Sequence, residues 1–571
     1  MKILIKKTYI IILLVMMLNQ ANVFAKDSKF LYTGENISNY FLGLISVNND
    51  SNNEAFQYLK KVQLLKDEHH RYNVEFIRTL ILLEKFDKAF TFSKKIWKKE
   101  ELFFEVDLLL GLQYFLKKDY KSAEKHFVRL NSISENNPFF KDFIGNVLIA
   151  WSKASQKKEA ESFEILNKIP ERYIHLRQTQ SAFLNCFLDT KNTKKSFEEL
   201  IYNESYNFSR YNFFLANYLL YKNKKEEAKK IIETSRKKYN SNLLLKQTEY
   251  FILNDKGYKV KNFFNCRSAE NSLSEFFYIL ANIFSGEKEY QLSNFYLKIS
   301  TYLNNNFLSN NALLAENYYF QNQDVQSKKI YKSLKKIGTV YSWYASKSVA
   351  TILKSEKGTE YAVGILEEAF NLIPKPNYEH YYDFANFYKE NEYYKKSIEY
   401  YSLALKDINE DHSLFPKILD RRGTSYERIG KWEKAEEDLM GSLKIIPDQP
   451  HVLNYLAYSW VDKGINLDKG LEMLKKANSL KQNDGYITDS LGWAYYAKKN
   501  YIQAEKYLQE AVELLPSDPI INDHYADVLW MLNKNIQARY FWDYVLNLEE
   551  TEQELKDKIN KKLLFGINKK L

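Results

Sequence analysis

One stretch, Asp484–Pro516, restricts the possible folds of this chain more than any other feature. It divides into two amphipathic halves that are joined by the short polar turn Lys498–Asn500. In each half, apolar and small side chains recur at the spacing of one helix face, which predicts helices over Tyr486–Lys498 and Tyr501–Leu515. Pro516 lacks a backbone N–H and predicts the end of the second helix. The stretch therefore predicts a pair of antiparallel helices.

The pair has small residues at fixed positions, and these positions recur along the chain. Gly492 and Ala504 stand twelve positions apart, one on each predicted helix, where small side chains let the two helices approach closely. A glycine or alanine in register with Gly492 returns at nearly constant intervals, at Ala281, Ala315, Ala350, Ala385, Gly423, Ala457 and Ala526. Continued to the amino terminus, the series predicts about fifteen units. Its amino-terminal positions are Gly43, Ile77, Gly111, Gly145, Ala182 and Ala216.

This unit resembles the tetratricopeptide repeat (TPR), a helix–turn–helix module of about 34 residues. The resemblance rests on large residues at Leu491, Tyr495 and Leu508, on the recurring small residues and on the closing proline. It is most specific over residues 414–547 and degenerate elsewhere. The resemblance implies an all-α fold, an α-solenoid of stacked TPR-like helix pairs, because one unit cannot bury its own apolar face and neighbours must stack.

The clarity of the pattern varies along the chain and suggests a domain organisation. Residues 26–254 carry degenerate TPR-like units, and residues 275–548 carry clearer ones. Between them, residues 255–274 nearly lose the pattern, which predicts one irregular unit that bends the array and forms a soft boundary. Residues 549–571 are charged at first and then apolar, which predicts a C-terminal capping helix.

Residues 1–25 have the features of a signal peptide. Lys2, Lys6 and Lys7 precede the short apolar run Tyr9–Leu18, and cleavage is predicted after Ala25. An uncleaved N-terminal anchor is the alternative. The signal peptide predicts a secreted protein, which would be periplasmic in a Gram-negative bacterium. No second stretch is long and apolar enough to be a membrane helix, so the cleaved chain is not expected to be an integral membrane protein.

Charge and cysteine content restrict the possible partners and cross-links. The formal net charge of +11 is spread over the chain rather than clustered, which argues against binding to nucleic acid. Only two cysteines occur, Cys186 and Cys266, and both lie in apolar helical surroundings. They could pair in an oxidising compartment, but two separately buried thiols are the favoured interpretation.

The residue spacings that catalysis requires are absent. The chain has no phosphate-binding glycine loop, no H-E-x-x-H or C-x-x-C motif and no nucleophile elbow. Glu68, His69 and His70 are a weak metal candidate, because adjacent side chains on a helix diverge by about 100°. An enzyme active site within residues 255–274 would have too few residues for a catalytic domain. A non-catalytic protein without metal or cofactor is therefore predicted.

The resemblance implies a partner-binding groove. In TPR arrays the first helix of each unit lines the concave surface, and aromatic and polar side chains there can hold a protein segment. Asp489 and Asp523 stand where chaperone-binding relatives use cations to hold a terminal carboxylate, so a neutral or basic segment is expected. The matching groove positions are Asn454, Tyr458, Tyr486, Asp489, Trp493, Tyr496, Asp523, Asp527 and Trp530. Packing of Trp493 and Trp530 against the next repeat is the alternative interpretation of these two positions.

Two functions remain open from these observations. The first is a protein–protein interaction scaffold of the bacterial cell envelope, which binds an unidentified protein or peptide. The carboxy-terminal part of the chain supports it, since it looks like the last units of exported proteobacterial TPR proteins. For this function, Trp493→Ala and Asp489→Lys are expected to weaken partner capture and to keep the helical content. The alternative is a cell-wall or polysaccharide-binding assembly factor, whose groove aromatics stack on sugar rings.

Overall fold

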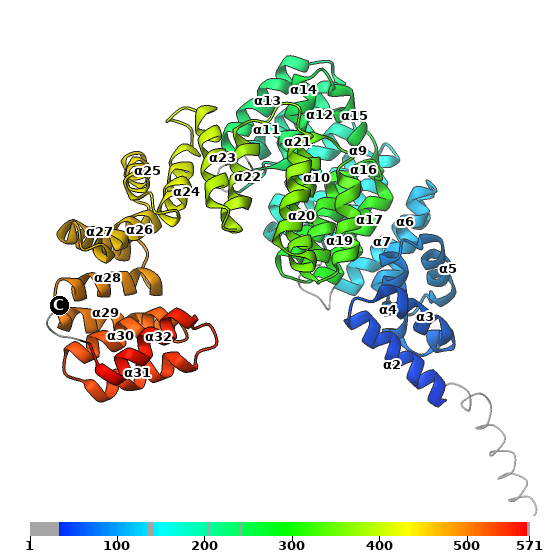
Figure 1. Ribbon diagram of the computed structural model, residues 1–571. Helices are drawn as coiled ribbons and strands as arrows, with labels where there is room; N and C mark the ends of the chain where they lie inside the picture. Colours follow the sequence, from blue (N-terminus) through cyan, green and yellow to red (C-terminus); the bar gives the residue numbers. More distant parts are fainter. Residues whose placement is uncertain (1–32, 135–141, 204–205, 240, 568–571) are drawn as a thin grey trace, which may run out of the picture. The chain divides into compact units, whose positions relative to one another are not determined.

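The computed structural model describes residues 33–134, 142–203, 206–239 and 241–567 (Figure 1). These residues form α-helices, connected by turns and three short 3-10 helices, and they contain no strand. The all-α prediction is confirmed. By their internal contacts the helices fall into two compact units, residues 1–369 and residues 370–571.

The described helices of the first unit follow one another as ten pairs, with a short turn between the first and the second helix of each pair. The 3-10 helices η1 (Gln63–Asp67), η2 (Glu171–Tyr173) and η3 (Leu308–Asn310) lie between pairs. The first helices are α2 (Gly34–Asn48), α4 (His70–Leu82), α6 (Phe104–Leu116), α8 (Ile144–Ser155), α10 (Ile174–Phe187), α12 (Tyr211–Tyr221), α14 (Leu243–Leu253), α16 (Ala269–Gly286), α18 (Asn311–Phe320) and α20 (Thr339–Lys357). The second helices are α3 (Asn52–Lys61), α5 (Phe86–Ile96), α7 (Tyr120–Ser134), α9 (Glu159–Asn167), α11 (Thr193–Ile201), α13 (Lys225–Lys238), α15 (Gly257–Phe263), α17 (Tyr290–Leu303), α19 (Asp324–Leu334) and α21 (Thr359–Asn371).

The second unit has five helix pairs and one additional helix. Together the described residues hold fifteen pairs, which confirms the predicted number of repeats. The first helices are α22 (Tyr378–Glu390), α24 (Phe415–Arg428), α26 (Pro450–Asp462), α28 (Gly485–Ala497) and α30 (Pro519–Met531). The second helices are α23 (Tyr394–Lys406), α25 (Trp432–Ile445), α27 (Leu467–Leu480), α29 (Tyr501–Leu514) and α31 (Asn535–Asn547), and the additional helix is α32 (Gln553–Phe565).

The recurring small residues lie where the two helices of a pair approach most closely. A Cβ atom on Gly492 would lie 2.6 Å from Cγ of Leu508, and one on Gly111 would lie 2.3 Å from the ring of Phe127. Ala504, in register on the second helix, is fully buried. Real Cβ contacts are not this short, so a larger residue at these positions would separate the helices. The packing rule derived from the repeats is thus confirmed.

The turn inside each pair contains at least one residue in the left-handed region, with φ between 48° and 88°. Left-handed backbone costs a non-glycine residue about 1–2 kcal/mol, and the repeated helix packing offsets this cost. Only three of these turns have glycine at a left-handed position. The repeat pattern in the sequence did not predict this left-handed backbone. Representative positions are Asp50, Glu84, Lys118, Asn223, Asn322, Gly430, Lys499 and Asn533.

In the first unit the chain returns and packs against its own early repeats. Helix α17 contacts α4, and α16 contacts both α8 and α10. Tyr302 of α17 stacks on Phe86 at 4.0 Å, and Lys298 Nζ lies 2.6 Å from Oε1 of Glu84. The returning chain therefore contacts the first helices α4, α8 and α10, and also α5 and the turn before it.

The irregular repeat predicted at residues 255–274 lies inside the first compact unit. The division between the two compact units follows Ala369. In the irregular repeat α15 is a short helix, and a loop leads from it directly into α16. Cys266 in this loop forms a disulfide with Cys186 of α10, with a Cα–Cα distance of 5.8 Å. The prediction of two separate thiols is therefore wrong. The sequence could not show the pairing, because the two cysteines are far apart along the chain and meet only when the chain turns back.

Residues 1–25, predicted as a signal peptide, lie outside the described residues. In the part of the chain that the structure does describe, no helix has both the length and the apolarity needed to cross a membrane.

Candidate functional site

The nine predicted groove residues lie on three successive first helices of the second unit. Helix α26 carries two of them, α28 carries four and α30 carries three, and α28 contacts both of its neighbours. We call the surface formed by these nine side chains the C-terminal face. Tyr486 is its most exposed member, at 60% of its surface. The structure therefore brings the predicted residues together, and their roles are distinguished by what each contacts.

An aromatic stack forms the middle of the C-terminal face. The ring of Trp493 stacks with that of Tyr496 at 4.5 Å and with the imidazole of His524 at 3.9 Å, both nearly parallel. Trp493 and Tyr496 remain half-buried, so each retains an accessible edge. Stacked aromatic rings have few internal rotations to lose on binding, which suits them to hold a partner.

Beneath the stack, Asp489 forms an ion pair with His524 of the neighbouring repeat. Nδ1 of His524 lies 3.0 and 3.1 Å from the two carboxylate oxygens, and both side chains are buried. Burial alone lowers the pKa of His524, but Asp489, Asp523 and Asp527 outweigh it and raise the pKa above its usual value. The pair joins α28 to α30. Sequence reasoning missed His524, which directly follows a predicted groove residue.

At the end of the face, two carboxylates hold a lysine from α32. Lys562 Nζ lies 2.7 Å from Asp523 Oδ1 and 2.8 Å from Asp527 Oδ1. Asp527 also accepts a hydrogen bond from Trp542 Nε1 at 3.0 Å. Burial and the adjacent Asp523 raise the pKa of Asp527 to about 6, although Lys562 opposes the shift. No spacing in the sequence pointed to Lys562, because α32 is not in repeat register.

Trp530 is covered by the end of the chain rather than open to a partner. Its Nε1 donates to the carbonyl oxygen of Ile567 at 3.1 Å. Glycine is required at position 566 for two reasons. A Cβ atom there would lie 2.0 Å from the Trp530 ring, and the backbone has a φ of +68°, in the left-handed region. Trp530 is therefore in contact with Ile567, and Asp523 and Asp527 are in contact with Lys562 of α32. The open part of the C-terminal face comprises Asn454, Tyr458, Tyr486, Trp493 and Tyr496.

Carboxylates lie close to two tyrosines of the open part. Burial, together with Asp489 and Asp462, raises the pKa of Tyr458 to about 12. Burial and then Asp527 likewise raise the pKa of Tyr496. The side-chain oxygen of Asn454 is buried and accepts no hydrogen bond from the described residues. Carboxylates beside an aromatic face favour a cationic ligand, and Asp489, Asp523 and Asp527 already have cationic partners in His524 and Lys562.

The titration of Asp527 gives a testable pH dependence. Its pKa is higher in the folded chain than the ordinary 3.8, so its stabilising contribution is complete below about pH 4 and lost as the pH rises through about 6. Asp527→Asn removes this titration. Its unfolding free energy relative to wild type is expected to rise by about 1–3 kcal/mol between pH 4.5 and 7.5, in urea unfolding followed by tryptophan fluorescence. The exposed Asp543→Asn is the control, and parallel pH profiles for wild type and Asp527→Asn would contradict the assignment.

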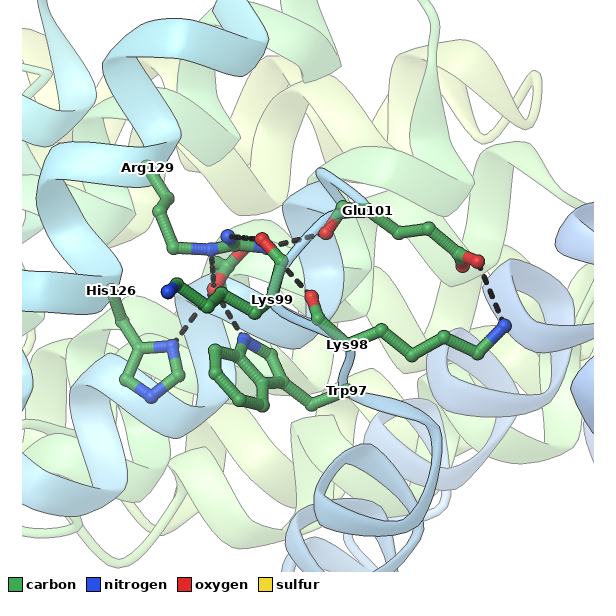
Figure 2. A network of polar contacts seen from close by, with 7 residues as sticks. Trp97, Lys98, Lys99, Glu101, His126 and Arg129 are labelled. Atoms are coloured by element: carbon green, nitrogen blue, oxygen red, sulfur yellow. Dashed lines mark hydrogen bonds and ion pairs between the residues drawn. The ribbon is translucent and has the colours of Figure 1, made fainter.

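A second aspartate–histidine pair lies in the first unit and has a structural role. Asp107 of α6 is fully buried, and one of its carboxylate oxygens lies 2.8 Å from His126 Nδ1. Figure 2 labels His126, Trp97 and Arg129, which belong to the same polar network. Trp97 Nε1 and Arg129 Nε donate to the same carboxylate at 3.2 and 2.9 Å. These contacts fasten the loop before α6 to α7. Arg129 completes the attachment with hydrogen bonds to the backbone oxygens of Lys98, Lys99 and Glu101.

The histidines of the weak metal candidate have separate partners. His69 caps α4 by accepting from the Tyr72 N–H at 3.4 Å, and His70 packs on the ring of Phe103 at 4.5 Å. Within the described residues, no group of three histidine, cysteine or acidic side chains is arranged to hold a metal ion.

Comparisons with known proteins identify the repeat. The family model "Tetratricopeptide repeat" matches residues 489–518, which include most of the helix pair α28–α29. A TPR repeat-containing protein of Pseudomonas aeruginosa is 28% identical over 130 residues, 23% of this chain and 21% of that protein. A UDP-N-acetylglucosamine–peptide N-acetylglucosaminyltransferase of Giardia intestinalis is 26% identical over 200 residues, 33% of this chain and 12% of that enzyme. This chain thus spans about a fifth or less of these two relatives. A solved tetratricopeptide repeat protein from Parabacteroides merdae is 19% identical, with a TM-score of 0.33, and the match covers 39% of this chain and 88% of that one.

Proposed function

The chain is a tetratricopeptide-repeat protein, and from this premise we propose that it is a non-catalytic scaffold of the bacterial cell envelope that binds a basic protein segment on its C-terminal face. Tetratricopeptide repeats support protein-interaction scaffolds in general. The open aromatic residues would supply the anchors for the partner. The neighbouring carboxylates would select its charge.

One observation carries the choice of a basic segment. Asp523 and Asp527 at the end of the face already hold the ammonium group of Lys562, at 2.7 and 2.8 Å. The face therefore binds a lysine of its own chain, and we extend the same preference for a cation to a partner segment on the open aromatic residues. Placement in the envelope is supported by the signal-like amino terminus and by the disulfide, since disulfides persist in oxidising compartments.

Tyr486 is the position at which binding is best tested. Its exposed ring makes little contribution to packing, so Tyr486→Ala is expected to weaken partner capture about tenfold without lowering thermal stability. Tyr540 on α31 is 67% exposed, and Tyr540→Ala is the matched control, expected to bind as wild type does. Asp489→Lys is not a clean test, because it would break the buried pair with His524.

The measurement is photo-crosslinking of the full-length protein in cells, with the crosslinking residue at position 486 or at position 540. A protein joined from position 486 and not from 540, through a segment rich in lysine or arginine, would support the proposal. Its affinity for the purified Tyr486→Ala variant then gives the fold-change. An acidic crosslinked segment, or equal capture by both variants, would contradict it.

A further inference from the structure

A hollow in the first unit has an aromatic floor. It lies among α3, α4 and α5 and is lined by Phe56, Phe76, Leu80 and Phe92. The Phe76 ring stacks with that of Phe56 at 6.2 Å and meets Phe92 edge-on at 4.9 Å. Phe56 is half-buried and the other three are buried, so core packing fixes the floor and Phe56 presents its accessible part.

Lysine side chains surround this floor. Lys60, Lys88 and Lys95 line the hollow. The ammonium groups of Lys60, Lys85 and Lys88 lie 6.0, 5.4 and 5.6 Å from the centre of the Phe56 ring. Lys60 belongs to α3, whereas Lys88 and Lys95 belong to α5. The arrangement is therefore a product of the tertiary structure, because it depends on the packing of two helices.

These positive charges are not neutralised by ion pairs. None of the four lysines forms an ion pair with a described carboxylate, although Asp87 also lines the hollow. Two ammonium groups within 6.0 Å of one ring centre are at most about 12 Å apart, a distance comparable with the screening length at physiological salt. They therefore repel one another. A bound anion would reverse this repulsion, and the face of Phe56 offsets only part of it.

We propose that this hollow binds an anionic group carried on an apolar body, such as a phosphate or carboxylate with an alkyl chain. The lysines contact the anion, and the chain lies against Phe56 and the aromatic floor. A pocket with an apolar floor and a few convergent charged groups is typical of small-molecule sites. The site lies in the first unit and is independent of the C-terminal face.

The test is calorimetric titration of the full-length protein with decyl phosphate below its micelle concentration, and with inorganic phosphate. Decyl phosphate is expected to bind at least tenfold more tightly. Lys60→Gln combined with Lys88→Gln should weaken its binding at least tenfold. The control combines Lys61→Gln with Lys94→Gln, which removes the same charge from exposed positions of the same two helices and should change binding less than twofold.

Equal affinity for the two phosphates, or an equal loss in both double variants, would overturn the proposal, as would no binding of decyl phosphate.

Sedimentation with vesicles then identifies the source of the ligand. Binding to phosphatidylglycerol vesicles but not to phosphatidylcholine vesicles, lost in the Lys60/Lys88 variant, indicates a lipid headgroup. Binding of decyl phosphate alone indicates a free amphiphile. Unchanged thermal unfolding of both double variants confirms that the fold is intact.

Discussion

Replacing Arg210 with methionine is expected to destabilise the first unit by about 3–5 kcal/mol. Arg210 Nε and one terminal nitrogen lie 2.7 and 2.8 Å from the two carboxylate oxygens of Glu275, which is fully buried. The guanidinium also donates to Asn310 Oδ1 at 2.6 Å. Removing the arginine would leave a carboxylate without a counter-charge inside the core, and this desolvated charge accounts for most of the loss.

The control for this prediction is the double variant Arg210→Met with Glu275→Leu. It removes both charges and is expected to be less destabilised than Arg210→Met alone. Burial raises the pKa of Glu275, so in Arg210→Met the carboxyl should take up a proton and the loss should be smaller at pH 5 than at pH 8. Thermal unfolding at both pH values measures these differences. A loss below about 1 kcal/mol, or one independent of pH, would show that the pair is not needed.

Removing the disulfide has the second large expected effect. The bond closes a loop with a sequence separation of 80, for which the chain-entropy model gives a stabilisation of up to about 4.5 kcal/mol at 25 °C. Cys186→Ala combined with Cys266→Ala is expected to lower the urea midpoint of the first unit and to increase hydrogen exchange in α10 and α16. Those helices are affected first because the bond joins α10 to the loop before α16.

Reduction provides the matched control. A phosphine reductant should lower the midpoint of the wild type to about that of the double variant and leave the double variant unchanged. Alkylation of free thiols in intact cells addresses the compartment at the same time. Protected cysteines in cells support the proposed export, whereas reactive thiols would place the chain in a reducing compartment and contradict it. An unchanged midpoint on reduction would show that the return of the chain is held by its other contacts.

The repeat architecture could be predicted because its interactions are close in sequence. Gly492 and Leu508 are sixteen positions apart, and their contact follows from helix periodicity and the recurring small positions alone. The same reasoning located α28 and α29 to within one residue at each end, and it predicted fifteen units. The register of the C-terminal face also followed, because every first helix presents the same positions to its neighbours.

The contacts that the residues of the C-terminal face make could not be predicted from the sequence. Asp489 was expected to contact a partner, but it is buried against His524, a contact between adjacent repeats that the pattern leaves undetermined. Asp523 and Asp527 were expected to be open, but they hold Lys562. Tyr486 was expected to be accessible, and it is.

The sequence by itself determined the all-α class, the helix pair and its repetition, because these depend on the spacing of apolar and small residues within one unit and the next. Only the tertiary structure decided where the chain meets itself again: the disulfide of Cys186 with Cys266, the pair of Arg210 with Glu275, and the cover of the chain end over Trp530. Each of these joins segments that the repeat pattern does not relate. Small rotations between successive repeats accumulate along the array, and the spacing of residues within one repeat does not determine the accumulated rotation.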